Sequence, residues 1–358
     1  MGRLYAGRVA AAAVVGSTRS VANHCWGCYT SGSMRPDGVE SVVARVPAWR
    51  DRPVAVRPLG TAPTTRHHLV TVDDGSSEAW VVRFPAEPVG LPGTDRAGEL
   101  EAATRAAALG IAPPVVGELP EAGTVITRFI PGHHLDAAAL AERLSDVVPL
   151  VRRFHGSGPL RTSFHVHRVV EWHARTAAAH DLVPPSAYER LHQQSRRIEQ
   201  AFGMAPTPLV PCHNDLLPSK VLRSDPEPSD DATEDGAAPE RLWLLDFGSA
   251  GMNDVVFDLA NLSIGAGLSE QADHELLRLY FGVVTPARWA RLQLMKVMSE
   301  FRDGMRAVSR QAIAAEAGAL DIATDAAMSA DEHLDRCERL ASRPQFTSWL
   351  EDAAHPIA

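Results

Sequence analysis

Two short apolar runs, each ending in a polar cluster that contains an Asp, constrain this chain more than any other feature. The first run, PTPLVPCHND, ends at Asp215, and the second, RLWLLDFG, contains Asp246. Short apolar runs bounded by turn residues are typical of buried strands. If the two strands are neighbours, their loops lie at one edge of a sheet and bring the two carboxylates together. Such a pair can supply a base for an alcohol and a ligand for Mg²⁺.

The order of the predicted elements indicates an α+β protein with two unequal parts. Strand patterns surround one Ala-rich helix over residues 54–130, and this helix ends near Gly110. Helical patterns dominate residues 131–340, where only the two apolar runs interrupt them. We therefore predict a small antiparallel-sheet lobe over residues 34–130 and a larger, mostly helical lobe over residues 131–358.

Two segments show no pattern of a packed core. Residues 1–33 are rich in Ala, Gly, Ser and Thr, which predicts a disordered leader or a misplaced translation start. Residues 224–240, SDPEPSDDATEDGAAPE, are acidic and lack large apolar side chains, so we expect a solvated loop there. An acidic interaction segment is the alternative for this loop.

Charge and composition narrow the expected partners and compartment. The net charge of −9 argues against a nucleic-acid backbone as the main partner and leaves a small-molecule substrate as the expectation. The apolar stretch Val9 to Gly16 is shorter than the roughly 20 residues of a membrane-spanning helix, so no membrane insertion is expected. Four cysteines do not make a disulfide scaffold, which favours the cytoplasm. The sequence does not set the oligomeric state.

The motifs around the two runs resemble those of a known superfamily. HND followed by LLP, and then LLDFGSAGMNDVVFDLAN, is similar to the catalytic and metal loops of the aminoglycoside phosphotransferase and choline kinase superfamily, and most like the bacterial LicA-type choline/ethanolamine kinases. Upstream, WVVRF, DRAGE and LGIAPPVV resemble that superfamily's strand, helix and turn in the same order. The resemblance implies a protein-kinase-like bilobal fold with ATP in the cleft.

The resemblance also implies roles for individual residues. Asp215 matches the catalytic base and His213 the histidine that orients its loop. Asp246 matches the Mg²⁺ ligand, and Asp258 the acidic residue that supports the catalytic loop. A helix N-cap is the alternative reading for an Asp of this kind.

The nucleotide side matches the superfamily only in part. Arg83 matches the residue that holds the ATP phosphates, paired with Glu99, although a surface Arg and a helix-face Glu are the alternatives. The phosphate loop keeps Gly60 and Thr64. Residues 61–63 between them include a proline, which lacks an amide donor. We therefore expect ATP binding to be weakened or differently arranged.

Three further positions depart from the pattern. Lys220 stands where the superfamily has an Asn that binds a second Mg²⁺, and an ammonium cannot ligate a metal. Lys220 could instead neutralise phosphate oxygens directly. Gly248 replaces a Glu of the metal loop, which removes a carboxylate. Arg306 replaces a Trp, which disfavours choline and would suit an anionic substrate, with a solvated surface Arg as the alternative.

Two functions remain open at this level. The first is an ATP-dependent phosphotransferase that acts on the hydroxyl of a choline- or ethanolamine-like amino alcohol, an aminoglycoside or a related metabolite. The second is a pseudokinase that binds a nucleotide, metabolite or protein without turnover. Besides Arg306, the candidate lining residues for the substrate are Trp172, Glu300 and Asp303, each with a core or surface role as the alternative.

Overall fold

The computed structural model describes residues 39–59, 65–75, 78–85, 96–119, 123–225, 240–316 and 329–356. The predicted leader and the phosphate-loop residues Gly60 and Thr64 lie outside these ranges. Of the predicted acidic loop, Ser224 is the last residue of a strand, and only Asp225 and Glu240 are described besides it.

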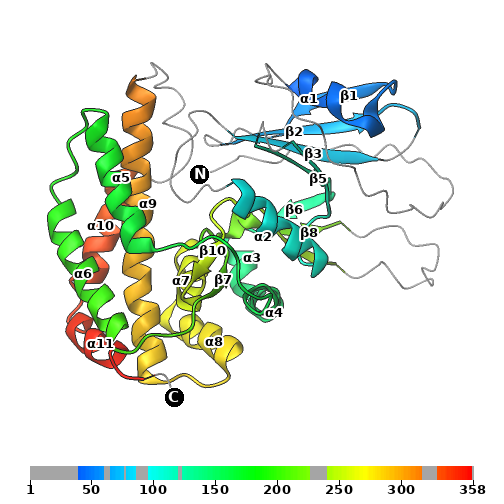
Figure 1. Ribbon diagram of the computed structural model, residues 1–358. Helices are drawn as coiled ribbons and strands as arrows, with labels where there is room; N and C mark the ends of the chain where they lie inside the picture. Colours follow the sequence, from blue (N-terminus) through cyan, green and yellow to red (C-terminus); the bar gives the residue numbers. More distant parts are fainter. Residues whose placement is uncertain are drawn as a thin grey trace.

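The N-terminal part is an antiparallel sheet of five strands (Figure 1). The strands follow the order β1 (Val54–Pro58), β2 (Thr65–Val72), β3 (Ala79–Pro85), β5 (Thr124–Arg128) and β4 (Val115–Leu119). Helix α1 (Val39–Arg45) and the 3₁₀ turn η1 (Pro47–Trp49) bury their apolar side chains against strand residues such as Val70 and Val82. Helix α2 (Arg96–Ala108) connects β3 to β4.

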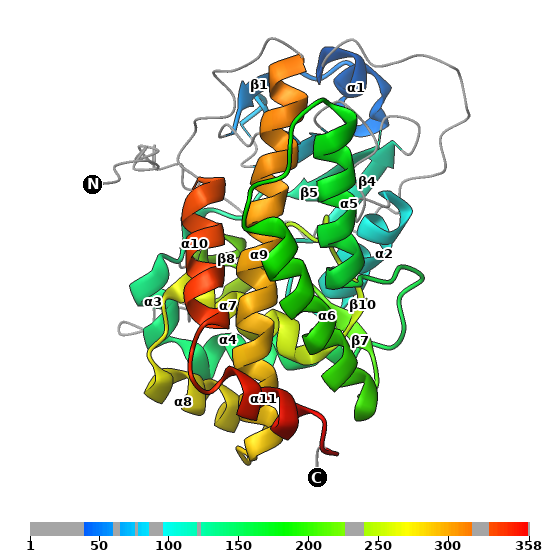
Figure 2. The same ribbon diagram turned by 90° about the vertical axis from the view of Figure 1, so that its left-hand side faces the viewer.

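The C-terminal part is mostly helical and is organised around one long helix, α9 (Pro286–Glu316) (Figures 1 and 2). Helices α5, α7, α10 and α11 pack against α9, and its buried face carries Leu294, Met298 and Phe301. The other helices of this part are α3 (Ala137–Glu142), α4 (Leu144–His155), α5 (Val166–Ala179), α6 (Tyr188–Met204), α7 (Val255–Ala266), α8 (Glu270–Phe281), α10 (Ala330–Ala341) and α11 (Phe346–Ala353). The α+β prediction, with a small antiparallel sheet and a helical C-terminal part, is confirmed.

The two apolar runs form strands, but these strands are not neighbours in one sheet, so that expectation was wrong. The first run forms β7 (Val210–Cys212), which pairs with β10 (Gly251–Asn253). The second forms β9 (Leu242–Leu244), which pairs with β8 (Val221–Ser224), and β8 also pairs with β6 (Gly132–His134). The partner of β7 lies further along the chain than β9 does, so distance in sequence does not decide this pairing.

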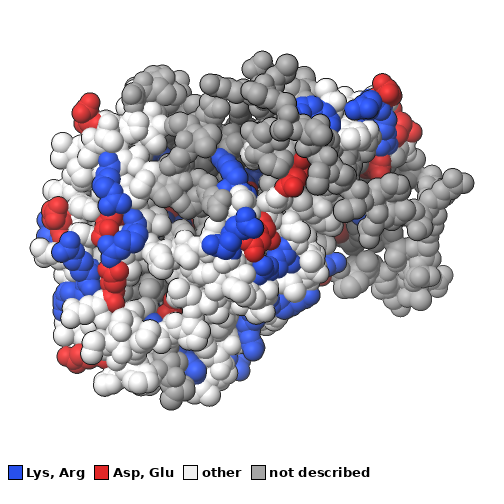
Figure 3. All heavy atoms as spheres, in the orientation of Figure 1, with Lys and Arg blue, Asp and Glu red and all other residues white. Residues whose placement is uncertain are grey.

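The surface over α5 and α6 mixes charges of both signs. Figure 3 shows basic and acidic side chains beside one another on this face. Arg168, for example, lies 2.5 Å from Glu171 on its own helix and 2.5 Å from Glu199 on α6. Among the described helices, none combines the length and the apolar composition needed to cross a membrane.

Candidate active site

The loop after β7 is held in place by the buried carboxylate of Asp258, in the first turn of α7. Its two oxygens accept hydrogen bonds from the backbone amides of His213 and Asn214, both at 2.7 Å. His155 Nε2 lies 3.0 Å from the same carboxylate. Burial alone would raise the pKa of Asp258, but the hydrogen bonds from His155 and from the His213 amide, together with the charges of both histidines, hold this pKa below its usual value. Asp258 therefore acts as an ionised anchor for the loop.

Asn214 adopts a left-handed backbone, with φ of 63°, between His213 and Asp215. Asn tolerates this conformation better than most side chains. Its side-chain amide donates to the carbonyls of Ser249 (3.0 Å) and Gly251 (3.2 Å), and its oxygen accepts from Asn253 (2.8 Å). Asn214 thus joins the loop after β7 to the segment after β9. The HND motif contained this residue, but sequence reasoning gave it no role.

His213 makes the second connection between the two loops. Its Nε2 lies 2.9 Å from the carbonyl oxygen of Leu245, the residue before Asp246. Its ring also packs against Phe247, with 5.0 Å between the ring centroids. These side-chain contacts link the two loops although β7 and β9 lie in separate sheets.

Two arginines of α9 hold the carboxylate of Asp215. Arg302 and Arg306 both donate to Asp215 Oδ1, each at 3.2 Å. Arg302 is almost fully buried and also donates to the carbonyl of Asn214 and to Asn261 Oδ1, both at 3.0 Å. Burial would raise the pKa of Asp215, but the charges of Arg306, Arg302 and Lys220 outweigh it and hold this pKa well below its usual value. Asp215 is therefore an ionised carboxylate.

Sequence reasoning missed Arg302. The available signal was its place in LMKVMSEFRDGM, a helical stretch rich in apolar residues, where Arg302 directly follows the buried Phe301. An arginine at a buried helix position needs carboxylate or carbonyl partners, because an unpaired buried charge is costly. The sequence therefore indicated that Arg302 needs an acceptor, but it did not identify Asp215 as that acceptor.

The carboxylate of Asp246 lies between two cations. Arg83 of β3 donates from Nη2 to Asp246 Oδ1 at 3.0 Å, and its other terminal nitrogen pairs with Glu99 of α2. Lys220 Nζ donates to Asp246 Oδ2. The backbone assists this pairing, because Leu245 N donates to the carbonyl of Lys220 at 2.8 Å, which places Lys220 opposite Asp246. Burial would raise the pKa of Asp246, but Lys220 and Arg83 lower it well below its usual value.

Gly248 leaves space for the Arg83 guanidinium. A Cβ atom at Gly248 would lie 2.8 Å from Arg83 Nη2 and 3.3 Å from Asp246 Oδ1. The position that carries a carboxylate in the superfamily pattern is therefore filled here by the guanidinium of Arg83.

This arrangement does not fit Mg²⁺. A divalent cation needs several oxygen ligands, and Asp246 is the carboxylate that the sequence offers for it. Both Asp246 oxygens instead face cationic side chains, and Lys220 has no acceptor atom to replace the expected amide.

The structure brings two of the four candidate substrate residues together and places the other two elsewhere. Arg306 and Asp303 lie beside Asp215, and Arg306 Nη2 is 2.8 Å from Asp303 Oδ1. Glu300 is buried and lies 2.6 Å from His333 Nδ1, so its partner is on α10. Trp172 is half-buried on α5, where its ring contacts that of His173.

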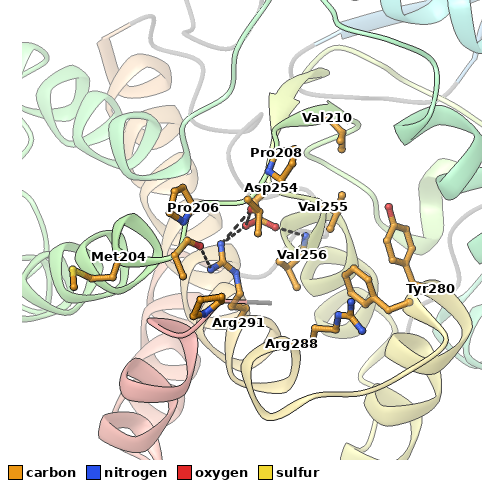
Figure 4. A pocket seen from close by; sticks show the side chains of 14 residues that line it. Met204, Pro206, Pro208, Val210, Asp254, Val255, Val256, Tyr280, Arg288 and Arg291 are labelled. Carbon is orange, nitrogen blue, oxygen red and sulfur yellow. Dashed lines mark hydrogen bonds and ion pairs between the residues drawn. The ribbon is translucent and has the colours of Figure 1, made fainter. Parts of the chain in front are cut away.

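A separate cavity of about 590 Å³ lies at the start of α7, and its lining includes neither Asp215 nor Asp246 (Figure 4). Arg291 projects into its wall and donates to Asp254 Oδ2 at 2.7 Å. Asp254 also accepts a hydrogen bond from the backbone amide of Val256 at 3.0 Å, so it is the N-cap of α7. These contacts give the polar groups of this wall a structural role.

The two-part α+β fold thus carries two carboxylates on linked loops, and each carboxylate is held by basic side chains. Residues 65–294, more than half of the 358 residues, match the phosphotransferase enzyme family. The chain belongs to this family.

Known relatives agree with this assignment. The protein LicA of Haemophilus influenzae is 36% identical over 72 residues, which are 20% of this chain and only 22% of that protein. The structure of a choline/ethanolamine kinase family protein from Mesorhizobium loti has a TM-score of 0.69 at 23% identity, covering 90% of this chain and 99% of its own.

Two similar structures contain ligands. LicA in complex with AMP has a TM-score of 0.67 at 18% identity and covers 87% of this chain and 98% of its own. An aminoglycoside phosphotransferase in complex with GDP and kanamycin has a TM-score of 0.54 at 15% identity and covers 84% of this chain and 99% of its own. At these identities the likeness shows a shared fold.

Proposed function

We propose that this protein transfers the terminal phosphoryl group of ATP to the hydroxyl of a small molecule, with Asp215 as the catalytic base. The observation that carries the proposal is the geometry of Asp215. Both arginine hydrogen bonds go to Oδ1, and among the described residues none donates to Oδ2. The first oxygen is therefore anchored, and the second is available to a hydroxyl donor.

The reaction needs little covalent chemistry from the protein. The acceptor hydroxyl gives its proton to Asp215 Oδ2, its oxygen bonds to the γ-phosphorus, and the bond from that phosphorus to the β,γ-bridging oxygen breaks to leave ADP. A base with a low pKa suffices, because the transition state of such transfers is loose and the proton moves late. Positioning then supplies much of the rate.

Arg83 and Lys220 are the residues that we propose for the ATP phosphates. Both are cations at Asp246, and both side chains are partly exposed, by 15% and 23%. Charge-assisted hydrogen bonds to phosphate oxygens would replace those to the carboxylate, and Arg can bind such oxygens with two N–H groups at once.

The test is ATP turnover by the purified protein with a panel of amino alcohols, aminoglycosides, sugars and hydroxy acids. We expect Asp215→Asn to lower transfer by about a thousandfold, since a positioned base contributes on the order of 10²–10⁴ in rate. Binding of a non-hydrolysable ATP analogue should remain. Transfer at the wild-type rate in Asp215→Asn would contradict the assignment of the base.

A nucleotide- or metabolite-binding protein without turnover is the second candidate. The observation in its favour is the pairing of both Asp246 oxygens with Arg83 and Lys220. Binding of the ATP analogue, combined with no transfer to any member of the panel, would support this candidate over the first.

A further inference from the structure

Basic groups outnumber acidic groups around Asp215. Arg302 and Arg306 share the two carboxylates of Asp215 and Asp303, at distances of 2.8 to 3.2 Å. Arg310 follows Arg306 by about one turn of α9, so it lies on the same side of the helix. In the described part of the chain, Arg310 has no carboxylate partner. Three guanidinium groups therefore face two carboxylates.

Arg310 is a partly buried cation that lacks a counter-ion within the described ranges. Burial and the nearby charge of Arg306 lower the pKa of Arg310 to about 10, so it still carries its charge at neutral pH. A partly desolvated charge without a partner is unfavourable, and an anion bound beside it would relieve that cost.

His173 of α5, which contacts α9 beside these arginines, adds no charge. His173 of α5 lies with Nδ1 2.8 Å from Ser309 Oγ, and Ser309 donates to the carbonyl of Arg306 at 3.0 Å. Burial and the charges of Arg306, Arg302 and Arg310 lower the pKa of His173 to about 3. His173 is therefore neutral and holds the helix face without a charge of its own.

We propose that Arg310, together with Arg306, binds an anionic group of the acceptor, so that the substrate is a small hydroxyl compound that carries a carboxylate or a phosphate. This inference rests on the proposed function, because it assumes that the acceptor hydroxyl lies at Asp215. A guanidinium matches the geometry of either oxyanion with two parallel hydrogen bonds. A quaternary ammonium such as choline would meet a net positive charge here and be repelled.

The anion belongs to the acceptor rather than to ATP because the basic residues form two separate sets. Arg83 and Lys220 contact Asp246. Arg302 and Arg306 contact Asp215, next to the place of the reacting hydroxyl. The next basic side chain along α9 after this second set is that of Arg310.

Titration calorimetry in the presence of a non-hydrolysable ATP analogue tests this inference. The probes are glycerate, glycerol 3-phosphate, ethanolamine and choline, and the variants are Arg310→Gln and, as a matched control, Arg339→Gln, an exposed arginine of α10. We expect glycerate or glycerol 3-phosphate to bind the wild type and the control, and Arg310→Gln to weaken this binding by about tenfold. The affinity for the ATP analogue should stay within about twofold, because Arg310 is assigned to the acceptor.

Three results would overturn the inference: choline bound more tightly than both anions, no anion bound at millimolar concentration, or anion binding unchanged in Arg310→Gln. Comparison of glycerate with glycerol 3-phosphate shows which oxyanion the site takes. Transfer of phosphate to choline would keep the proposed function and exclude an anionic acceptor. Anion binding that depends on Arg310 but leads to no transfer with any acceptor would keep the anion site and contradict the proposed function.

Discussion

At the scale of single residues, the carboxylates of Asp215 and Asp246 differ in how many of their oxygens are paired with basic side chains. Asp215 accepts both arginine hydrogen bonds with Oδ1. Asp246 instead accepts one hydrogen bond from Arg83 with Oδ1 and one from Lys220 with Oδ2. This difference separates a carboxylate with an available oxygen from one with both oxygens paired. Arg83 and Lys220 therefore both oppose a metal ion at Asp246, and Lys220 also stands where the superfamily pattern has an amide.

Lys220→Asn should strengthen Mg²⁺-dependent nucleotide binding. The change removes a cation beside Asp246 and supplies an amide oxygen, which is a ligand that Mg²⁺ accepts. Two unit charges 4 Å apart interact by about 4 kcal/mol at an effective dielectric of 20, so even partial relief would raise affinity by about tenfold. The measurement is calorimetric titration of ATP with Mg²⁺ and with EDTA.

Lys220→Arg is the matched control, because it keeps the positive charge and adds no acceptor. It should leave the Mg²⁺ dependence as in the wild type. An equal gain in Lys220→Arg, or no gain in Lys220→Asn, would show that the charge of Lys220 does not oppose the metal.

At the scale of elements, the first turn of α7 determines the shape of the catalytic loop. The Asp258 carboxylate accepts the amides of His213 and Asn214 and is contacted by His155 of α4. These three contacts connect one loop and two helices through a single side chain. Removal of the charge should therefore affect stability as well as activity.

Asp258→Asn should lower the free energy of unfolding by about 3 kcal/mol near pH 7, because an amide can satisfy only part of these buried donors. It should also change the pH dependence. Because the pKa of Asp258 is lowered in the folded state, its stabilisation is present above the ordinary Asp pKa of about 3.9 and is lost as the pH falls toward the lower folded value.

Urea unfolding at pH 7, 5 and 3 measures both effects. Between pH 5 and pH 3 the wild type should lose about 1 kcal/mol more stability than Asp258→Asn does. Asp335→Asn, an exposed Asp of α10, is the control and should follow the wild type. Parallel pH curves for the wild type and Asp258→Asn would contradict this role.

At the scale of the whole molecule, Arg83 connects the two parts of the fold. It lies on β3 of the N-terminal sheet, pairs with Glu99 of α2 and reaches Asp246 beside the helical part. Gly248 makes this reach possible, because any side chain there would meet the guanidinium. This one contact between the two parts, from Arg83 to Asp246, depends on the absence of a side chain at Gly248.

Gly248→Ala should weaken binding of the ATP analogue by about tenfold, the equivalent of one charge-assisted hydrogen bond. The new Cβ would displace Arg83 Nη2 from Asp246, and the φ angle of Gly248 is outside the left-handed region, so the main conflict is steric. Gly203→Ala in α6 is the control, since no atom beyond its chain neighbours and the local helix backbone lies within 4 Å of its added Cβ. Equal affinity in Gly248→Ala and Gly203→Ala would contradict the steric argument.

The sequence by itself determined the fold class and the order of the elements. Alternation and apolar spacing depend on local backbone geometry, so β1 to β5, α2 and the two apolar strands could be predicted. The motif residues Asp215 and Asp246 could be selected as well, because their neighbours in sequence form recognisable loops. Asp258 within FDLAN was selected through the resemblance to the superfamily.

Only the tertiary structure decided which charges meet. Arg302 and Arg306 contact Asp215, whereas Lys220 and Arg83 contact Asp246. Glu300 pairs with a histidine of α10 instead. The two apolar runs also turned out to lie in separate small sheets. Such contacts join residues far apart in the chain, and their partners are chosen by packing and desolvation rather than by local propensity. The sequence could therefore indicate the family and the two loops, while the balance of charge around their carboxylates followed only from the fold.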